Sequence, residues 1–121
     1  IDYAYLENEM KNTLQAVSKH KYCNVLKSFR TSDITYNLSF NLINMIIKNL
    51  GPCSSLSTTQ KKFLTKLGIL NRAEILSKNM SFSDKADIYY RVKRLIDESQ
   101  MGHLFKVMFI TNHKNKFKLG F

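Results

Sequence analysis

Two strand-like segments at opposite ends of the chain, with helix-forming segments between them, are the feature that most limits its fold. Residues 1–5, "IDYAY", combine β-branched and aromatic side chains, which favour strands. Residues 104–111, "LFKVMFIT", form an apolar run interrupted by one charge and predict a mostly buried strand. A charged residue inside such a strand, here Lys106, is expected at a sheet edge or rim. Strands separated by helices indicate an α/β fold.

The clearest helix signal covers residues 40–50, "FNLINMIIKNL". Ser39 is a favourable N-cap, and Gly51 with Pro52 ends the segment. The apolar side chains recur every three or four residues, as in an amphipathic helix; they are Phe40, Ile43, Ile47 and Leu50.

Three further helices are predicted before the last strand. Ser57 and Gln60 have the spacing of an S-x-x-Q capping box, so a helix is expected to start there and to end at Gly68. A short helix is expected over residues 71–79, and a longer one, capped by Ser83, over residues 84–99.

The remaining segments give weaker signals. Residues 13–17 predict a second short strand, residues 18–33 irregular chain, and the basic tail 112–121 a segment that leaves the core. Two or three strands make a poor sheet alone. The sequence therefore predicts that strands on the N-terminal side are missing from this chain.

The charge of the chain leaves two function classes open. The net charge is +10, which fits a basic nucleic-acid-binding module, with Lys85, Arg91, Lys93 and Arg94 beside Tyr89 and Tyr90 as its best cluster. However, only 4 of the 19 basic residues are Arg, the residue that favours specific phosphate and base contacts. A solvated helix face explains the cluster equally well, so nucleic acid is the less favoured partner.

Metal and membrane chemistry find little support in the sequence. Cys23 and Cys53 lie thirty residues apart without a CxxC pair, and His20 near Cys23 does not complete a ligand set. We therefore expect no metal site and two reduced thiols. No run of 18 apolar residues occurs, so no membrane span is expected.

Five segments, in order, resemble one family. "IDYAY" resembles its "DYG" strand end, "NTLQAVSKHKY" its "DTLQA…GH.Y" segment, and "SDITYNLSF" its "ADLTAHVDF". "TTQKKFLTKLGILNRAEIL" is similar to "VTQ..FL..LGI..R...L", and "QMGHLFKVMFIT" to "QMG.LFKV.A.T". These are segments of the MidA-type SAM-dependent methyltransferases, which include a mitochondrial protein-arginine methyltransferase that assists respiratory complex I assembly.

The chain departs from the family pattern at several positions. The glycine of "DYG" is Ala4 here, and the histidine and aspartate of "AHVDF" are Asn37 and Ser39. The Gly-Pro before "TQ" is Leu56-Ser57. If the family histidine or aspartate served chemistry, this chain has lost it, although Ser39 also replaces one N-cap by another.

The resemblance implies the C-terminal, substrate-side part of a Rossmann-like class I methyltransferase fold, with helices packed on a partial sheet. It implies that the last strand runs antiparallel to its sheet, with Leu104, Val107 and Phe109 buried. It also implies a protein substrate, for which a complex I subunit is the family example, in the cytoplasm of a bacterium or the mitochondrial matrix of a eukaryote.

The cofactor of such an enzyme is S-adenosyl-L-methionine (SAM), held by a glycine-rich turn after a strand and an acidic residue after the next. The four glycines of this chain form no such turn. We therefore expect no SAM site in the chain, no activity of the chain alone, and a missing or separately encoded SAM-binding N-terminal half as partner. An inert remnant or scaffold is the alternative.

No catalytic residue is identified, but six residues are substrate-binding candidates because they match family motifs or end a strand. They are Asp2, Tyr3, His20, Asp33, Thr35 and Gln60. Each also has a structural explanation: Asp2 can cap a turn, a lone histidine is often a hydrogen-bonding residue, and Asp33 and Thr35 can order their loop. The capping box accounts for Gln60.

Overall fold

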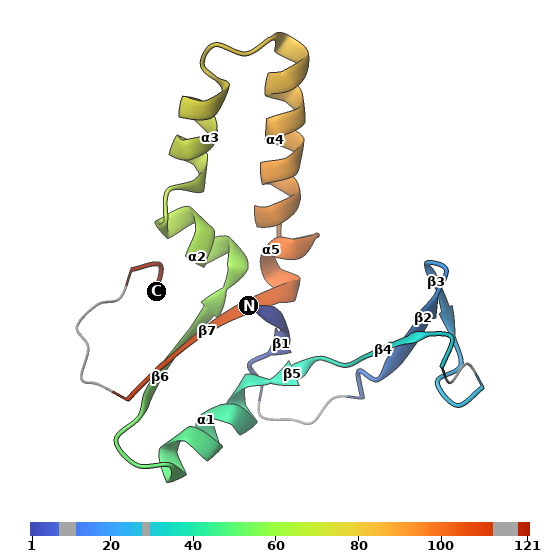
Figure 1. Cartoon of the computed structure of the whole chain (residues 1–121). Coiled ribbons are helices and arrows are strands. Elements are labelled where there is room, and N and C mark those ends of the chain that lie inside the picture. The colour runs from blue at the N-terminus through green and yellow to red at the C-terminus, as the bar shows by residue number, and fades with distance from the viewer. Residues whose placement is uncertain (8–11, 28–29, 113–118) are drawn as a thin grey trace.

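The first and last strands of the chain pair with each other at the centre of a four-stranded sheet. The computed structural model describes residues 1–7, 12–27, 30–112 and 119–121, and Figure 1 shows their arrangement. Strand β1 (Asp2–Tyr5) runs antiparallel to β7 (Phe105–Thr111), with Asp2 opposite Lys106. The predicted strands and their antiparallel pairing are thereby confirmed.

Two more strands complete this sheet, in the order β5-β1-β7-β6. Strand β5 (Leu38–Ser39) lies parallel to β1, and β6 (Ser54–Thr59) is antiparallel to β7 over six residue pairs. Strand β7 is therefore interior, and Lys106 is buried with 6% of its surface exposed. The prediction of an edge or rim position for Lys106 is wrong, because β6 pairs with the side of β7 that was expected to be free.

Strand β6 also corrects the predicted capping box. Residues 54–59 are extended, and the N-cap of α2 (Gln60–Lys66) is Thr59, whose Oγ1 accepts a hydrogen bond from the Lys62 backbone N–H at 3.3 Å. Ser57 lies inside the strand. The ladder with β7 satisfies the backbone of these polar residues, which no local signal in "SSLSTT" indicates.

Helix α1 (Phe40–Asn49) starts as predicted, with Ser39 Oγ accepting from the Leu42 N–H at 3.3 Å. Helices α3 (Ile69–Ser77) and α4 (Phe82–Ile96) form a hairpin that stands away from the sheet (Figure 1). Ser81, rather than Ser83, caps α4, since its Oγ accepts from the Asp84 N–H at 3.2 Å.

A short helix, α5 (Met101–Leu104), directly precedes β7. It leaves Leu104 46% exposed, contrary to the prediction of burial, whereas Val107 is buried and Phe109 half-buried. Gly102 packs against the backbone carbonyl of Ile96 so closely that a Cβ would overlap it. A glycine is required here because of this close approach.

A second, separate sheet contains the short strand predicted over residues 13–17, and it extends into residues 18–33, where irregular chain was predicted. Strand β2 (Gln15–Ser18) pairs with β3 (Lys21–Cys23) on one side and β4 (Asp33–Thr35) on the other, all antiparallel. Lys19 and His20 join β2 to β3 with φ of 49° and 63°, the positive values of a two-residue hairpin turn. We call this three-stranded sheet the arm; it projects from the sheet on the side away from α1 (Figure 1).

The end of the chain returns to the body. Residues 113–118 of the predicted solvent-exposed tail lie outside the described residues, but Gly120 is buried. The Phe121 ring lies 5.4 Å from that of Phe63 and 6.1 Å from that of Phe109. For these last residues the prediction that the tail leaves the core is wrong.

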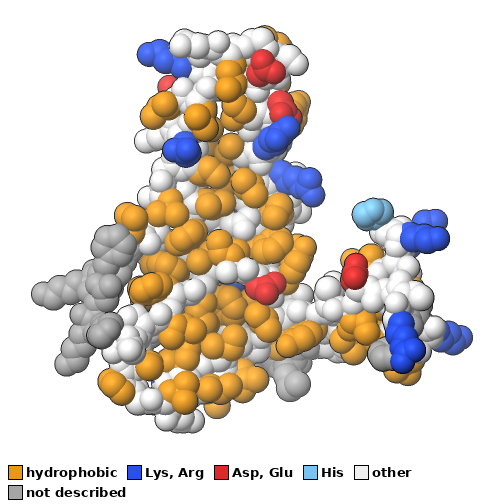
Figure 2. All heavy atoms as spheres, in the orientation of Figure 1, with side chains coloured by type: hydrophobic (Ala, Val, Ile, Leu, Met, Phe, Trp, Pro, Cys, Tyr) orange, Lys and Arg blue, Asp and Glu red, His pale blue; other side chains and the backbone are white. Residues whose placement is uncertain are grey.

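The core is small for the length of the chain. Six apolar residues among those described are buried, and they are Ala4, Tyr5, Ala16, Phe40, Ile47 and Val107. The solvent-accessible surface is 9830 Å², whereas a folded monomer of this length exposes about 6,700 Å². Orange apolar side chains accordingly cover much of the face in Figure 2. None of the described helices is long and apolar enough to cross a bilayer.

Adjacent isoleucines on α1 provide a test of this core. Ile47 is 5% exposed and Ile46 is 51% exposed. We expect Ile47→Ala to lower the free energy of unfolding by about 2–5 kcal/mol, because it leaves a cavity. Ile46→Ala, the matched control, should change it by about 0.5 kcal/mol or less. Denaturant unfolding followed by circular dichroism measures both, and equal losses would contradict the described packing of α1.

Candidate functional site

Two hollows flank the neck, the pair of segments 12–14 and 36–37 that joins the arm to the sheet. Within the neck, Thr13 Oγ1 accepts a hydrogen bond from the Asn37 backbone N–H at 2.9 Å. Thr13 and Asn37 line both hollows. The neck therefore lies between the two hollows and contributes residues to both.

The first of them, the arm–sheet hollow, has a volume of about 610 Å³. One wall is a single face of the arm, and the other wall contains Tyr3 from β1 and Leu104 from α5. The Tyr3 ring lies 4.2 Å from the Phe105 ring at an interplanar angle of 39°, which fixes its position on this wall. The lining side chains from the arm are Gln15, Val17, Tyr22, Asp33 and Thr35.

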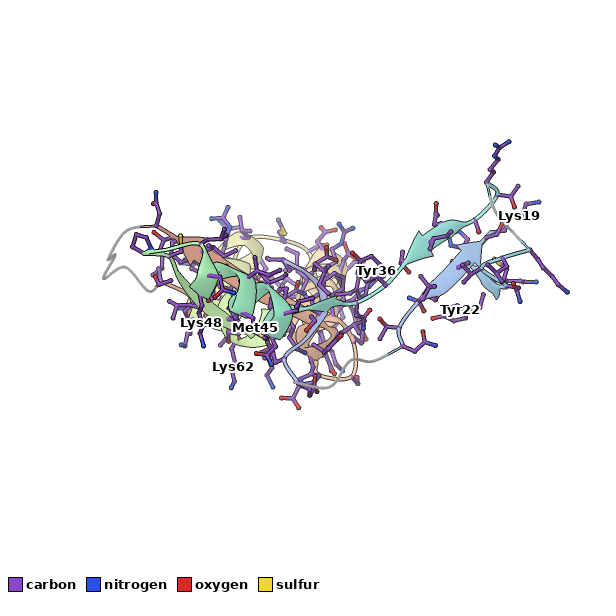
Figure 3. The ribbon with its side chains drawn as sticks, turned by 90° about the horizontal axis from the view of Figure 1, so that it is seen from below. Lys19, Tyr22, Tyr36, Met45, Lys48 and Lys62 are labelled. Carbon is purple, nitrogen blue, oxygen red and sulfur yellow. The ribbon has the colours of Figure 1, made fainter. Side chains whose placement is uncertain are left out.

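The second hollow, the α1 groove, has a volume of about 800 Å³. It opens at the carboxyl ends of the parallel strands β1 and β5, where Tyr5 and Ser39 lie, and continues along α1 past Leu42 and Met45. In open α/β sheets, ligands bind outside the carboxyl ends of parallel strands. Figure 3, seen from the side of α1, shows Met45 on that helix and Tyr36 near the neck.

The structure brings three of the six candidate residues together. Tyr3, Asp33 and Thr35 all line the arm–sheet hollow, although thirty positions separate Tyr3 from Asp33 in the sequence. Gln15 and Tyr22 also line the arm wall but were not predicted as site residues. Side chains alternate between the two faces of a strand, but β2 and β4 are too short for this alternation to show before the strands are paired.

The other three candidates lie elsewhere. Asp2 is exposed at the amino end of β1, and its Oδ1 accepts from the Tyr3 backbone N–H at 2.8 Å. His20 is exposed in the β2–β3 turn. Gln60 is buried, and its Nε2 donates to the Leu95 carbonyl at 2.9 Å, which ties the start of α2 to the end of α4. This bond, not a capping box, occupies the Gln60 side chain.

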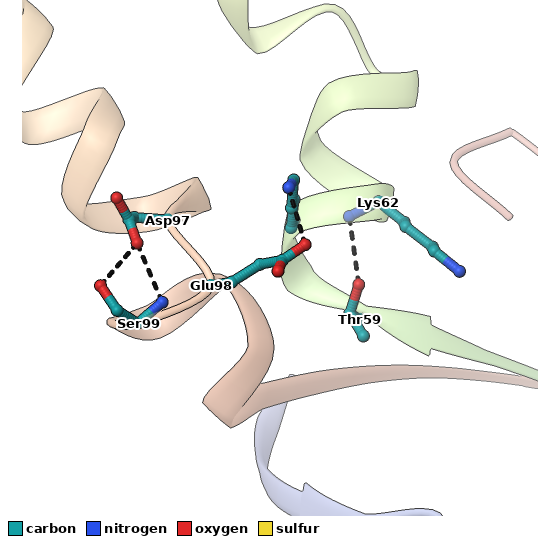
Figure 4. Close-up of polar contacts among 6 residues, drawn as sticks. Thr59, Lys62, Asp97, Glu98 and Ser99 are labelled. Atoms are coloured by element: carbon teal, nitrogen blue, oxygen red, sulfur yellow. Dashed lines mark hydrogen bonds and ion pairs between the residues drawn. The ribbon is translucent and has the colours of Figure 1, made fainter.

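A polar cluster fixes the junction of α4 and α5. Lys61 Nζ lies 2.8 Å from Glu98 Oε1, and Ser99 donates to Asp97 Oδ1 through both its hydroxyl, at 2.6 Å, and its backbone N–H, at 2.9 Å (Figure 4). The two Ser99 donors hold the pKa of Asp97 below its usual range, and the Lys61 hydrogen bond and charge do the same for the pKa of Glu98.

The described residues gather no metal ligands, since no three His, Cys, Asp or Glu side chains come together among them. The described glycines also do not form the glycine-rich turn that holds SAM in Rossmann-like folds. Gly51 and Gly68 follow helices, Gly102 lies in α5 against Ile96, and Gly120 lies against Phe63, so no glycine forms a turn from a strand into a helix. We therefore assign no described residue of this chain to SAM binding.

Comparisons with known proteins bear on the family resemblance and on the fold. Residues 1–59 match a family described as "Putative S-adenosyl-L-methionine-dependent methyltransferase". The mitochondrial protein arginine methyltransferase NDUFAF7 of Xenopus tropicalis is 28% identical over 106 residues, covering 87% of this chain and 24% of that protein. Its counterpart from Xenopus laevis is 26% identical over 121 residues, covering 97% of this chain and 27% of that protein.

The resemblance of the chain to the MidA-type methyltransferases is thereby confirmed. An uncharacterized COG1565 superfamily protein from Burkholderia thailandensis superposes with a TM-score of 0.79 at 23% identity, over 98% of this chain and 33% of that one. Another COG1565 member from the same species, solved with S-adenosyl-homocysteine, has a TM-score of 0.69 at 24% identity, over 90% of this chain and 30% of that one. These two structures share the mixed α/β fold of this chain. The chain spans about a quarter of the length of the curated relatives it matches.

The lowered pKa of Asp97 predicts a pH-dependent stability. A carboxylate with a lowered pKa in the folded state stabilises the fold above its unfolded pKa, and this contribution disappears as the pH falls through the folded value. Wild type should therefore be more stable than Asp97→Asn at pH 7, and the difference should shrink below about pH 4. Denaturant unfolding at several pH values measures it, with Ser99→Ala as the variant that lacks the hydroxyl donor. A difference independent of pH would contradict this prediction.

Proposed function

We propose that the chain is the C-terminal, substrate-side part of a SAM-dependent protein methyltransferase that modifies arginine. The observation that carries the proposal is the similarity to two protein arginine methyltransferases over 87% and 97% of the chain. A respiratory complex I subunit as the substrate rests on the family resemblance alone. In this reaction the guanidinium nitrogen attacks the methyl group of SAM, which a different part of the enzyme supplies.

The described residues support substrate binding by this chain and SAM binding by another part of the enzyme. Its described glycines form no glycine-rich turn for SAM, whereas two hollows lie at the carboxyl ends of β1 and β5 and between the arm and the sheet. We assign residues 1–121 to substrate binding and the cofactor to a SAM-binding part, whether joined to this chain or separately encoded. Of the six candidates, Tyr3, Asp33 and Thr35 share one hollow and are our choice for substrate contact. Asp2, His20 and Gln60 stay predictions without a shared site.

The apolar surface of α1 supports docking of the SAM-binding part there. Leu42, Met45, Ile46 and Leu50 are each more than half exposed and lie three to four residues apart, so they share one helix face. This face borders the α1 groove and the parallel β1–β5 pair, and parallel strands are normally covered on both faces. The relatives, about four times longer than the chain, contain enough further protein to cover it.

The proposed activity is tested by methyl transfer. A longer protein that contains this chain, or the chain co-expressed with a separate SAM-binding part, should transfer labelled methyl groups from SAM to arginine in a protein. The 121-residue chain alone should transfer none and should show no micromolar SAM binding in calorimetry, because it lacks the glycine-rich turn. Tight, stoichiometric SAM binding by the chain alone would contradict the assignment. A folded complex that binds SAM and transfers nothing would favour an inert scaffold.

The docking face has its own test. Met45 is 60% exposed, so Met45→Glu should leave the fold of the chain intact while a charge on the apolar face weakens co-purification with the SAM-binding part by about tenfold or more. Phe82→Glu is the matched control, since Phe82 is 89% exposed but begins α4, outside the α1 face. Undiminished binding of Met45→Glu would show that α1 is not the docking surface.

A further inference from the structure

The arm–sheet hollow has a wall whose residues are set by strand register. Residues directly opposite each other in antiparallel strands share a face of the sheet. Val17 is opposite both Tyr22 and Asp33, and Gln15 is opposite Thr35. These five residues are the arm residues that line the hollow. One face of the arm therefore forms a wall of the hollow.

The sign of the charge in this hollow is opposite to that of the chain. The net charge of the chain is +10, yet no Lys or Arg is among the lining residues, and Asp33 is the only charged one. Lys21 is opposite Ser18 in the register and therefore belongs to the other face of the arm. Within the described residues, the Asp33 carboxylate has no hydrogen bond or ion pair, so it is available to a ligand.

Aromatic and neutral polar groups surround this carboxylate. Tyr22 is 79% exposed and Tyr3 is 39% exposed, so both rings can be covered by a ligand. Gln15, Thr35 and Asn37 contribute amide and hydroxyl oxygens, which accept hydrogen bonds. Tyrosine faces attract cations, and a single carboxylate pairs with a guanidinium through two parallel hydrogen bonds. A planar cation with several N–H donors matches this set of groups better than a compact ammonium does.

We propose that the arm–sheet hollow binds the guanidinium group of an arginine side chain in the protein substrate, with Asp33 as its ion-pair partner and Tyr3 and Tyr22 as aromatic walls. This assignment names the substrate-recognition site of the proposed methyltransferase and rests on that function for its role. The binding itself is a property of this chain alone. It forms no covalent bond and requires no SAM.

Binding of short peptides to the 121-residue chain tests the site directly. The probes are an acetylated, amidated Gly-Gly-Arg-Gly-Gly peptide and the same peptide with citrulline or lysine in place of arginine. Citrulline keeps the shape and removes the charge, so it should bind at least about tenfold more weakly, and lysine should fall between the two. Equal binding of the arginine and citrulline peptides would overturn the proposal.

Two variants identify the residues. Asp33→Asn should weaken the arginine peptide by about tenfold or more, because it removes a charge-assisted hydrogen-bonded pair. Asp87→Asn is the matched control, since Asp87 is an exposed aspartate on α4 that pairs with Arg91 at 2.8 Å, and it should bind as wild type does. Tyr22→Leu, at a 79% exposed position that tolerates replacement, should weaken binding severalfold. If neither Asp33→Asn nor Tyr22→Leu changes affinity, the assignment is wrong.

The outcomes separate this inference from the proposed function. Peptide binding that depends on Asp33, without methyl transfer by the longer protein, would leave the recognition site standing and remove the activity. Methyl transfer whose KM is unchanged by Asp33→Asn would support the proposed activity and overturn the assignment of Asp33 to substrate recognition. The KM is the informative quantity, because loss of a binding contact raises it.

Discussion

The antiparallel pairing of β1 with β7 is the contact on which the rest of the structure depends. It joins segments about a hundred residues apart and places β7 inside the sheet, so that β6 can pair with its other side. In the sequence, β1 and β7 enclose all the helices and β6. Their pairing therefore brings the two ends of this long segment together. The buried Lys106 follows from the same pairing, and its ammonium donates to the carbonyl of His103 at the end of α5. A long aliphatic stem can occupy an apolar interior while its charged end finds a polar group.

The accessible surface of the chain is large for its length. The accessible surface is about half again what a folded monomer of this length exposes. The arm and the α3–α4 hairpin each project from the sheet (Figure 1), and among the described residues neither α3 nor α4 has a buried side chain. Isolated helices of this length are marginal in water, so α3 and α4 depend on packing against each other and against α2. The proposed SAM-binding part would cover the exposed apolar face of α1.

Charge is distributed in a way that total composition does not reveal. A chain of net charge +10 suggests an anionic partner, yet the arm–sheet hollow contains one carboxylate and no basic side chain. The basic cluster on α4 is partly engaged within the helix, since Arg91 pairs with Asp87 four residues earlier. Short-range contacts decide recognition, because charges separated by more than about 8–10 Å are largely screened at physiological ionic strength.

By itself the sequence determined the terminal strands, the short strand β2, helix α1 with its Ser39 cap, the approximate positions of α2, α3 and α4, and the family resemblance. These features have local causes: β-branched composition, apolar periodicity, capping residues and glycine stops. Only the tertiary structure decided the short strands β3 to β6, the interior position of Lys106, and the union of Tyr3 with Asp33 and Thr35 in one hollow. Strands of two to six residues carry too few side chains for a period of two to stand out, and their stability comes from backbone partners far away in the sequence. Tyr22 could be placed in the candidate site only from the register of the arm, where it lies opposite Val17. The pairing of a strand decides which face each of its residues occupies.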